Sequence, residues 1–295
     1  ALANSGGVDD VPSSGDYSGS LPNGNVLYIT DVKGRVFGVY ASSTDAVNNS
    51  VTVNGKVGNF LYGGYSRDGK ATGNLVDVVS GEMTYTILRG GYSMNKDATE
   101  NKVYVRSGTI QDIYGGYSRN GISSGNIVDI ANATIRRAVY GGYSFYNSVG
   151  PNSVNIKDSF VGSSGVVSDV YGGRSDYMNV TGCDATVSES TVLGSLYGGY
   201  GARSTLISGN SVTMNGGRTD GSVYGGYGAG VSVDNTASVT GGTVGKGVWG
   251  GYSSQGSVTG GWATVSGGTV AGAVYGGQTP TGEAVSANGA VVSGG

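Results

Sequence analysis

The chain has 295 residues, of which 59 are glycine, and only 13% are charged. Its 17 basic and 20 acidic residues give a net charge of −3 without a basic cluster, so neither nucleic acid nor an anionic membrane surface is an expected partner. No apolar run approaches the roughly 18 residues that span a bilayer, which predicts no membrane insertion by this chain. Histidine is absent and Cys183 is the single cysteine. This excludes Ser-His-Asp and Cys-His catalysis, cysteine–histidine zinc sites and a disulfide framework.

A segment without repeats, residues 1–30, opens the chain, and we expect it to form a cap or an extended tail. Residues 31–295 form a β-helix repeat domain, in which a tetrad built around Gly-Gly returns about every 26 residues. Copies start at Tyr62, Arg89, Tyr114, Tyr140, Tyr171, Tyr197, Tyr224, Trp249 and Tyr275, with a degenerate copy at Phe37. Self-similarity at this period is typical of solenoids, propellers and repeat arrays.

One strand of each repeat ends in the tetrad and carries an aliphatic residue directly before it. Because this position is aliphatic in every copy, we expect a buried column. Its members are Val36, Leu61, Leu88, Ile113, Val139, Val170, Leu196, Val223, Val248 and Val274.

A second strand alternates apolar and polar residues with period two, as a strand with one buried face does. Its inward pairs are Val51/Val53, Val76/Val78, Val103/Val105, Val128/Ile130, Val154/Ile156, Ala185/Val187, Val212/Met214, Ala237/Val239, Ala263/Val265 and Ala290/Val292. A third signal, often preceded by glycine, supplies Val57, Met83, Ile110, Ile135, Val161, Val192, Val244 and Val270.

Three short strands per repeat, joined by glycine-rich corners, predict an all-β fold. The architecture that fits is a triangular parallel β-helix, or β-solenoid, of about ten three-strand coils, each bonded to the next at about 4.8 Å. A propeller is disfavoured because its blades need about 40–50 residues each. Helices are disfavoured by the glycine content and the β-branched enrichment.

An asparagine stands two residues before the second strand in most repeats. Its parity with the inward valines predicts a ladder of stacked amides. Cys183 and Gly261 replace it in two repeats, so we expect Cys183 to be an unreactive buried filler rather than a reactive thiol. The asparagines are Asn49, Asn74, Asn101, Asn126, Asn152, Asn210, Asn235 and Asn288.

One step between tetrads, from Tyr140 to Tyr171, is 31 residues long. It indicates an insertion of about five residues, and we expect Ser163, Ser164 and Gly165 to lie in a bulging loop. Protruding loops are where solenoids often carry function, although a passive loop explains the insertion as well.

Acidic residues give no catalytic pattern. Enzymes with a parallel β-helix that act on polysaccharides need two or three acidic groups converging on one face. Asp77 and Asp129 are expected to point outward from the second strand, but two coils apart and with Tyr104 between them. We therefore expect no enzymatic activity, no cofactor and no metal site, and keep a polysaccharide-acting enzyme as an alternative.

Aromatic residues form two columns beside the Gly-Gly pair. The first follows the buried aliphatic residue, so a regular strand would turn it outward as an exposed stripe that binds a sugar or a protein. These candidate binding residues are Tyr62, Tyr114, Tyr140, Tyr171, Tyr197, Tyr224, Trp249 and Tyr275. Alternatively, the rings only stabilise one another and shield the glycine backbone. The second column has inward parity unless Gly-Gly forms a bulge, so its orientation stays open: Tyr65, Tyr92, Tyr117, Tyr143, Tyr200, Tyr227 and Tyr252.

The tandem V-Y-G-G-Y-S and S-G-G-T-V units, as at 139–144 and 266–270, resemble the passenger domains of bacterial autotransporters and related secreted adhesins. The likeness covers residues 31–295. It implies a right-handed β-helix that is secreted or displayed on the bacterial surface and takes part in attachment, aggregation or biofilm formation. The implied partners are a host or bacterial surface glycan or protein, or further copies of the chain.

The last repeat ends in mid-coil, because residues 292–295 match 239–242 and 265–268, after which Thr-Val would follow. We expect either a fragment of a longer protein or an end that another subunit completes. The second case gives an alternative function, a subunit of an extracellular fibre that polymerises by end-to-end stacking of coils. Ice binding is a weaker idea, since no regular outward Thr-x-Thr face is apparent.

Overall fold

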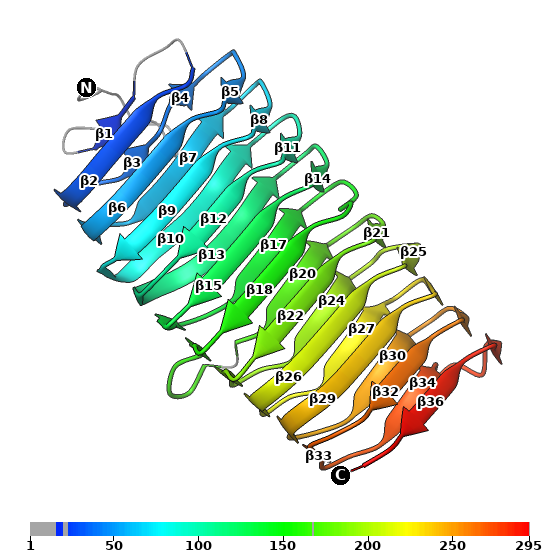
Figure 1. Ribbon diagram of the computed structural model, residues 1–295. Coiled ribbons are helices and arrows are strands. Elements are labelled where there is room, and N and C mark those ends of the chain that lie inside the picture. The colour runs from blue at the N-terminus through cyan, green and yellow to red at the C-terminus, as the bar shows by residue number, and fades with distance from the viewer. Residues whose placement is uncertain (1–15, 20–22, 167, 295) are drawn as a thin grey trace.

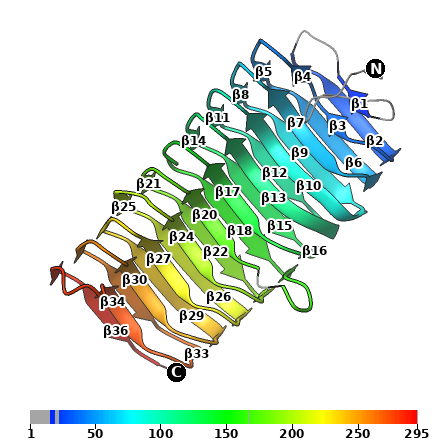
Figure 2. The ribbon, with the colours of Figure 1, turned by 180° about the vertical axis from the view of Figure 1, so that it is seen from behind.

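The computed structural model describes residues 16–19, 23–166 and 168–294, and within these ranges all regular secondary structure is β-strand. Strands stack in coils along one axis, from β1 (Tyr17–Ser18) to β36 (Gly289–Val292), as Figures 1 and 2 show. Every pairing between named strands is parallel and joins one coil to the next. The predicted parallel β-solenoid of about ten turns is therefore confirmed. None of the described residues belongs to a helix long and apolar enough to cross a membrane.

One side of each coil is the strand that alternates apolar and polar residues. In β15 (Ile127–Ala131), Val128 and Ile130 are buried whereas Asp129 between them is half-buried. The predicted inward pairs are buried in every coil except the last described one, where Ala290 and Val292 are exposed. The other strands of this side are β2 (Val26–Val32), β6 (Ser50–Val57), β9 (Leu75–Ser80), β12 (Lys102–Val105), β18 (Ser153–Lys157), β22 (Asp184–Ser188), β26 (Ser211–Thr219), β29 (Thr236–Val244) and β32 (Trp262–Val265).

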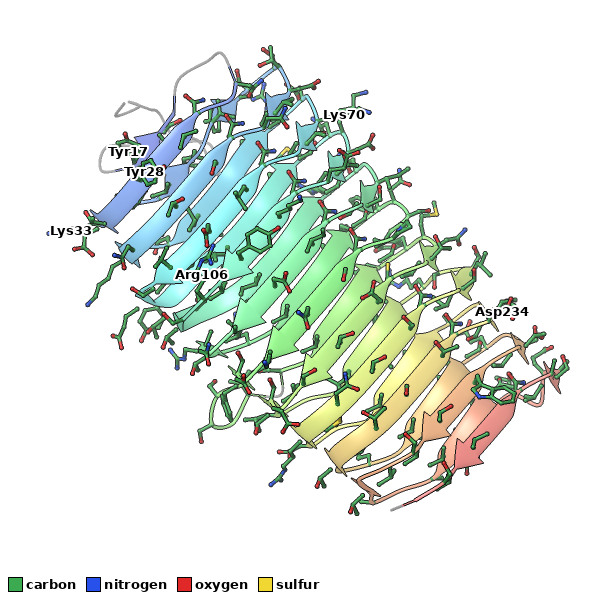
Figure 3. The ribbon with its side chains drawn as sticks, viewed as in Figure 1. Tyr17, Tyr28, Lys33, Lys70, Arg106 and Asp234 are labelled. Carbon is green, nitrogen blue, oxygen red and sulfur yellow. The ribbon has the colours of Figure 1, made fainter. Side chains whose placement is uncertain are left out.

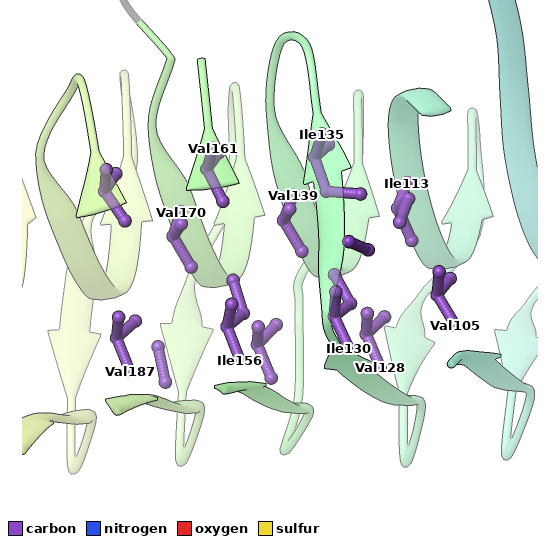
Figure 4. Close-up of a cluster of buried hydrophobic side chains, with 14 of the residues drawn as sticks. Val105, Ile113, Val128, Ile130, Ile135, Val139, Ile156, Val161, Val170 and Val187 are labelled. Atoms are coloured by element: carbon purple, nitrogen blue, oxygen red, sulfur yellow. The ribbon is translucent and has the colours of Figure 1, made fainter. Parts of the chain in front are cut away.

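A second side is formed by the tetrad strands. Of the ten aliphatic residues that precede the tetrad, nine are buried and Val274 is partly buried. They pack against the valines of the alternating strands in one core that runs along the rod (Figure 4). The strands are β3 (Val36–Phe37), β4 (Tyr40–Ala41), β7 (Phe60–Ser66), β10 (Glu82–Ser93), β13 (Gly108–Ser118), β17 (Val139–Ser144), β20 (Val170–Ser175), β24 (Leu196–Gly201), β27 (Val223–Gly228), β30 (Val248–Ser253) and β34 (Val274–Gln278).

The third side carries the remaining predicted column, which is buried from Val57 to Val244 and half-buried at Val270. In the one repeat that lacks an aliphatic residue there, Thr219 is buried and pairs with Val192 and Val244. Its hydroxyl donates to the Gly194 carbonyl at 2.6 Å, so the polar atom is satisfied. Separate strands on this side are β16 (Ala133–Ile135), β19 (Phe160–Val161), β23 (Thr191–Val192) and β33 (Thr269–Val270).

A fourth short strand, absent from the three-strand prediction, lies between the tetrad and the asparagine. The serine that ends the tetrad directs the chain into it: Ser144 Oγ donates to the Gly121 carbonyl at 2.8 Å and accepts from the Asn147 N–H at 3.0 Å. The residue before the asparagine is left-handed in most coils, as is Gly125 with φ 68°. These strands are β5 (Ala46–Val47), β8 (Ala71–Thr72), β11 (Ala98–Thr99), β14 (Ser123–Ser124), β21 (Val180–Thr181), β25 (Leu206–Ser208), β28 (Val231–Val233), β31 (Val258–Thr259) and β35 (Val285–Ser286).

The asparagines form the predicted ladder. Asn101 Nδ2 donates to Asn126 Oδ1 at 3.0 Å, and Asn126 Nδ2 donates to Asn152 Oδ1 at 2.8 Å. Asn126 Oδ1 also accepts the Asn101 backbone N–H at 3.0 Å, and Asn126 Nδ2 donates to the Ala98 carbonyl at 3.0 Å. A buried polar group left unpaired costs about 1–3 kcal/mol, so these bonds fix the asparagine corner of each coil.

Cys183 takes one rung of this ladder. Its backbone N–H donates to Asn210 Oδ1 at 3.0 Å, and its thiol donates to the Gly150 carbonyl at 2.8 Å. The side chain is buried, and burial raises the pKa of the Cys183 thiol to about 12. The thiol is thus protonated at neutral pH, in agreement with the expected unreactive filler.

The ladder explains the Gly-Gly pair. A Cβ on the second glycine, Gly116, would lie 2.5 Å from the side-chain amide of Asn126. A Cβ on the first, Gly115, would lie 2.3 Å from the carbonyl oxygen of Gly141 in the next coil. Neither distance is possible for a real side chain, so both positions need glycine for the tetrad strand and the ladder to approach this closely.

The insertion forms a loop that protrudes from the otherwise regular rod (Figure 1), and its described residues are 162–166 and 168–169. Ser164, Gly165 and Val166 are exposed, and the Val166 N–H donates to the Ser163 carbonyl at 3.0 Å in a tight turn. The predicted bulging loop is present at the predicted residues.

The cap or tail expected over residues 1–30 falls partly on residues outside the described ranges. Of the described part, β1 pairs in parallel with β3, and β2 pairs in parallel with β6. Tyr28, in β2, is 80% exposed and labelled in Figure 3.

The alternation of inward and outward residues in β15 allows a direct test of the core. Replacing both Val128 and Ile130 by Asp would place two unpaired charges among aliphatic side chains, at a cost of several kcal/mol. We expect loss of the β-type circular dichroism spectrum or a large fall in melting temperature. The matched control replaces the outward residues of the same strand, Ile127 and Ala131, by Asp. A control as unstable as the inward variant would contradict the assignment of the two faces.

Candidate functional site: two aromatic columns on one face

The two aromatic columns lie side by side on one face of the solenoid. In a regular strand, residues three apart point to opposite faces. In β17, however, the pairing with β20 passes from Tyr140 to Gly142 without including Gly141. Tyr140 and Tyr143 consequently meet edge to face, with ring centroids 5.8 Å apart. Both paired strands thus depart from strict alternation at the Gly-Gly pair without a shift in register, and the second column points to the same side as the first.

The first column is a stack of nearly parallel rings. From Tyr114 through Tyr140, Tyr171, Tyr197 and Tyr224, successive centroids are 4.5, 4.9, 5.0 and 5.2 Å apart, with interplanar angles of 8° or less. Trp249 continues the stack at 4.8 Å. The strand spacing of a parallel sheet imposes this repeat, which is close to the preferred separation of stacked rings.

The second column stacks in the same way over two stretches. Tyr65, Tyr92 and Tyr117 follow one another at 4.9 and 5.1 Å. Further along, Tyr227 and Tyr252 stack at 4.8 Å with an interplanar angle of 3°. Together the columns form a two-ring-wide aromatic surface along most of the rod.

One arginine replaces a ring in each column. Arg89 stands in the first column, with its guanidinium carbon 5.5 Å from the ring centroids of Tyr62 and Tyr114, and it also lies 4.8 and 4.7 Å from those of Tyr92 and Tyr117 in the second column. It also donates to the Tyr62 hydroxyl at 3.0 Å. Arg174 stands in the second column, 5.2 Å from the Tyr200 centroid. A planar guanidinium fills the place of a ring and adds cation–π attraction, so the stacks continue across both positions.

The rings are less exposed than the predicted stripe. Both columns lie outside the aliphatic core, the first as its parity predicted and the second in spite of its inward parity. Most of the rings are stacked between rings or a guanidinium of adjacent coils and meet a ring of the other column edge to face, as Tyr197 stacks on Tyr171 and Tyr224 and meets Tyr200. Of the eight predicted site residues, Tyr62 and Tyr171 are buried and Tyr275 is 41% exposed, while those half-buried are Tyr114, Tyr140, Tyr197, Tyr224 and Trp249.

Several tyrosine hydroxyls of this face are held in the neutral form by burial. Burial raises the pKa of seven of them, Tyr114, Tyr140, Tyr143, Tyr171, Tyr197, Tyr224 and Tyr227. Two hydroxyls donate to carboxylates: Tyr171 to Asp169 Oδ2 and Tyr143 to Asp176 Oδ2, both at 2.8 Å. The surface therefore offers neutral hydroxyls and apolar ring edges, which suit binding rather than proton transfer.

The acidic residues considered for catalysis lie on the alternating strands. Asp77 and Asp129 both pair in register with Tyr104, so they stand two coils apart as the sequence predicted. Asp77 is held by Arg106 at 3.0 and 2.9 Å (Arg106 is labelled in Figure 3), and Asp129 accepts from Asn155 at 2.8 Å. Across the described part of the chain, no three acidic or cysteine side chains come together as a metal site.

Sequence reasoning left two parts of this surface out. The second column was not included among the binding residues, because regular parity sends it inward. The arginines were visible as departures from the tetrad, RGGYS at Arg89 and YGGRS at Tyr171, and that signal could have identified them as ring substitutes.

Comparison with protein-family models, with curated proteins and with solved structures finds no match to this chain.

Raised tyrosine pKa values predict alkaline instability. A phenol whose folded pKa lies above its unfolded value of about 10 stabilises the fold fully below that value, and this contribution is lost as the pH rises further. We expect the free energy of unfolding to be level up to about pH 10 and to fall above it. Absorbance of tyrosinate, followed with urea unfolding, measures this. Ionisation of all 21 tyrosines near pH 10 in a folded protein would contradict it.

Proposed function

We propose that this chain is an extracellular adhesive β-solenoid of the autotransporter-passenger type, and that its aromatic face mediates attachment, aggregation or biofilm formation. The partner would be a glycan or protein of a host or bacterial surface, or a second copy of the chain. The observation that carries the proposal is the pair of ring columns, aligned on one face through successive coils.

A repeated surface of this kind suits many weak contacts. From Tyr114 to Trp249, equivalent rings recur at the spacing of the strands, and all are half-buried except Tyr171, which is buried. Tyrosine offers contact area and a hydrogen-bonding group at low cost in side-chain entropy. Because the stacked rings are held before binding, little ordering remains to oppose it, and contacts along a rigid rod add through multivalency.

The way in which the fold is stabilised is consistent with a position outside the cell. The coils are held by backbone pairing, the aliphatic core and the asparagine ladder, and Cys183 is buried and protonated. Such a fold needs neither a reducing nor an oxidising compartment.

Replacing Tyr140, Tyr171 and Tyr197 together by Thr tests the proposal. Threonine suits a strand, so the coils should remain folded while three adjacent rings of the first column are removed. With beads coated with the purified chain, we expect aggregation between beads and attachment to immobilised mucin to fall by about fivefold or more, because multivalent contacts are lost together.

A matched variant replaces three tyrosines away from the columns, Tyr28, Tyr104 and Tyr146, by Thr and should keep both activities. Circular dichroism confirms that each variant is folded. If the folded first-column variant aggregated and attached as well as the unmodified chain, the proposal would be contradicted and the rings would have only a structural role.

A further inference from the structure

Consecutive repeats differ in length at the same corner of the solenoid, the corner directly before the tetrad. Four of the coils differ there in the number of sequence positions between the third side and the tetrad strand, which are 84–87, 111–112, 136–138 and 162–169. Compared with the corner at 136–138, the corner at 111–112 is one residue shorter, that at 84–87 is one residue longer and that at 162–169 is five residues longer. A short corner between longer ones leaves a hollow on the surface.

That hollow has a volume of about 280 Å³, and its lining residues are Thr84, Tyr85, Gln111, Arg136, Arg137, Ser163 and Val166. The size lies near the lower end of the range for small-ligand sites, about 300 Å³. Among the described residues that line it, none is acidic. The inserted loop supplies Ser163 and Val166, so the largest irregularity of the repeat forms one wall.

The aromatic ring at the edge of the hollow is both exposed and held in place. Tyr85 is 73% exposed, yet the Arg136 guanidinium carbon lies 5.7 Å from its ring centroid. With the Gln111 amide oriented to satisfy both groups, its nitrogen donates to the Tyr85 carbonyl at 3.0 Å and its oxygen accepts from Arg137 at 3.1 Å. These contacts position the residues of three neighbouring coils around one space.

The two arginines differ in their partners. Arg137 approaches Asp112 Oδ2 at 3.9 Å, whereas Arg136 makes no ion pair within the described part of the chain. Arg136 is half-buried, and its guanidinium retains donors suited to a planar, two-oxygen anion such as a carboxylate. Two positive charges are too few for a nucleic acid, whose binding rests on many phosphate contacts.

We propose that this hollow binds one acidic sugar residue of a polysaccharide. The sugar ring lies against the exposed face of Tyr85, its carboxylate pairs with Arg136, and its hydroxyls bond to Gln111 and Ser163. An acidic sugar combines the flat ring, the single charge and the several hydroxyls that these groups complement. The site does not rest on the aromatic columns proposed above.

Calorimetric titration of the full chain with trigalacturonate tests the site. The matched neutral probe is trigalactose, in which each carboxylate is replaced by a hydroxymethyl group. We expect trigalacturonate to bind at least tenfold more tightly than trigalactose. Arg136→Ala and Tyr85→Ala should each weaken binding about tenfold or more, and Arg136→Lys should weaken it less than Arg136→Ala because the charge is kept.

Two control variants remove the same residue types elsewhere: Arg119→Ala and Tyr28→Ala, both at exposed positions, should leave the affinity within twofold. The Tyr140, Tyr171 and Tyr197 variant should also bind trigalacturonate normally, which separates this site from the aromatic columns. Equal binding of trigalactose, equal binding of triglutamate, tighter binding of a sulfated trigalactose, or full affinity in folded Arg136→Ala would each overturn the proposal.

Discussion

The packing of a side-chain amide onto a glycine is the contact on which the rest of this solenoid depends. Each asparagine of the ladder after Asn49 lies directly against the second glycine of a tetrad, as Asn126 lies against Gly116. Because the amide is buried, it must be fully hydrogen-bonded, and the ladder along the axis supplies those bonds. The chain therefore keeps an asparagine and a glycine at matching positions in nearly every coil.

This contact also sets the outer surface. At the two successive glycines the strand departs from strict alternation, so the side chains of Tyr140 and Tyr143 reach the same side of the sheet. Parallel pairing then stacks each ring on its equivalent in the next coil. Where an arginine stands instead, at Arg89 and Arg174, the guanidinium lies between the rings of the neighbouring coils in its own column. The aromatic face is thus a consequence of how the interior packs.

Much of the fold could be predicted from the sequence because repetition shows which positions share an environment. Val128 and Ile130 follow strict alternation, and Asn126 recurs with inward parity, so both were assigned correctly. The side to which Tyr143 points could not be predicted, because it depends on whether Gly141 takes part in the backbone pairing between coils. β14, with only Ser123 and Ser124, carries no hydrophobic pattern. The hollow beside Tyr85 arises from one-residue differences in corner length, whose effect appears only when four coils are placed side by side.

The most direct test of the asparagine–glycine contact is a double-mutant cycle on Gly116→Ala and Asn126→Ala, measured as the free energy of unfolding in urea. Gly116→Ala alone should destabilise the fold by about 1–3 kcal/mol or more, because its Cβ would collide with the Asn126 amide. The control variant Gly241→Ala should cost little, because a Cβ there would lie at least 3.4 Å from other atoms. With Asn126 already replaced by Ala, the amide is gone, and Gly116→Ala should cost less than half as much. Equal costs in both backgrounds would contradict the account.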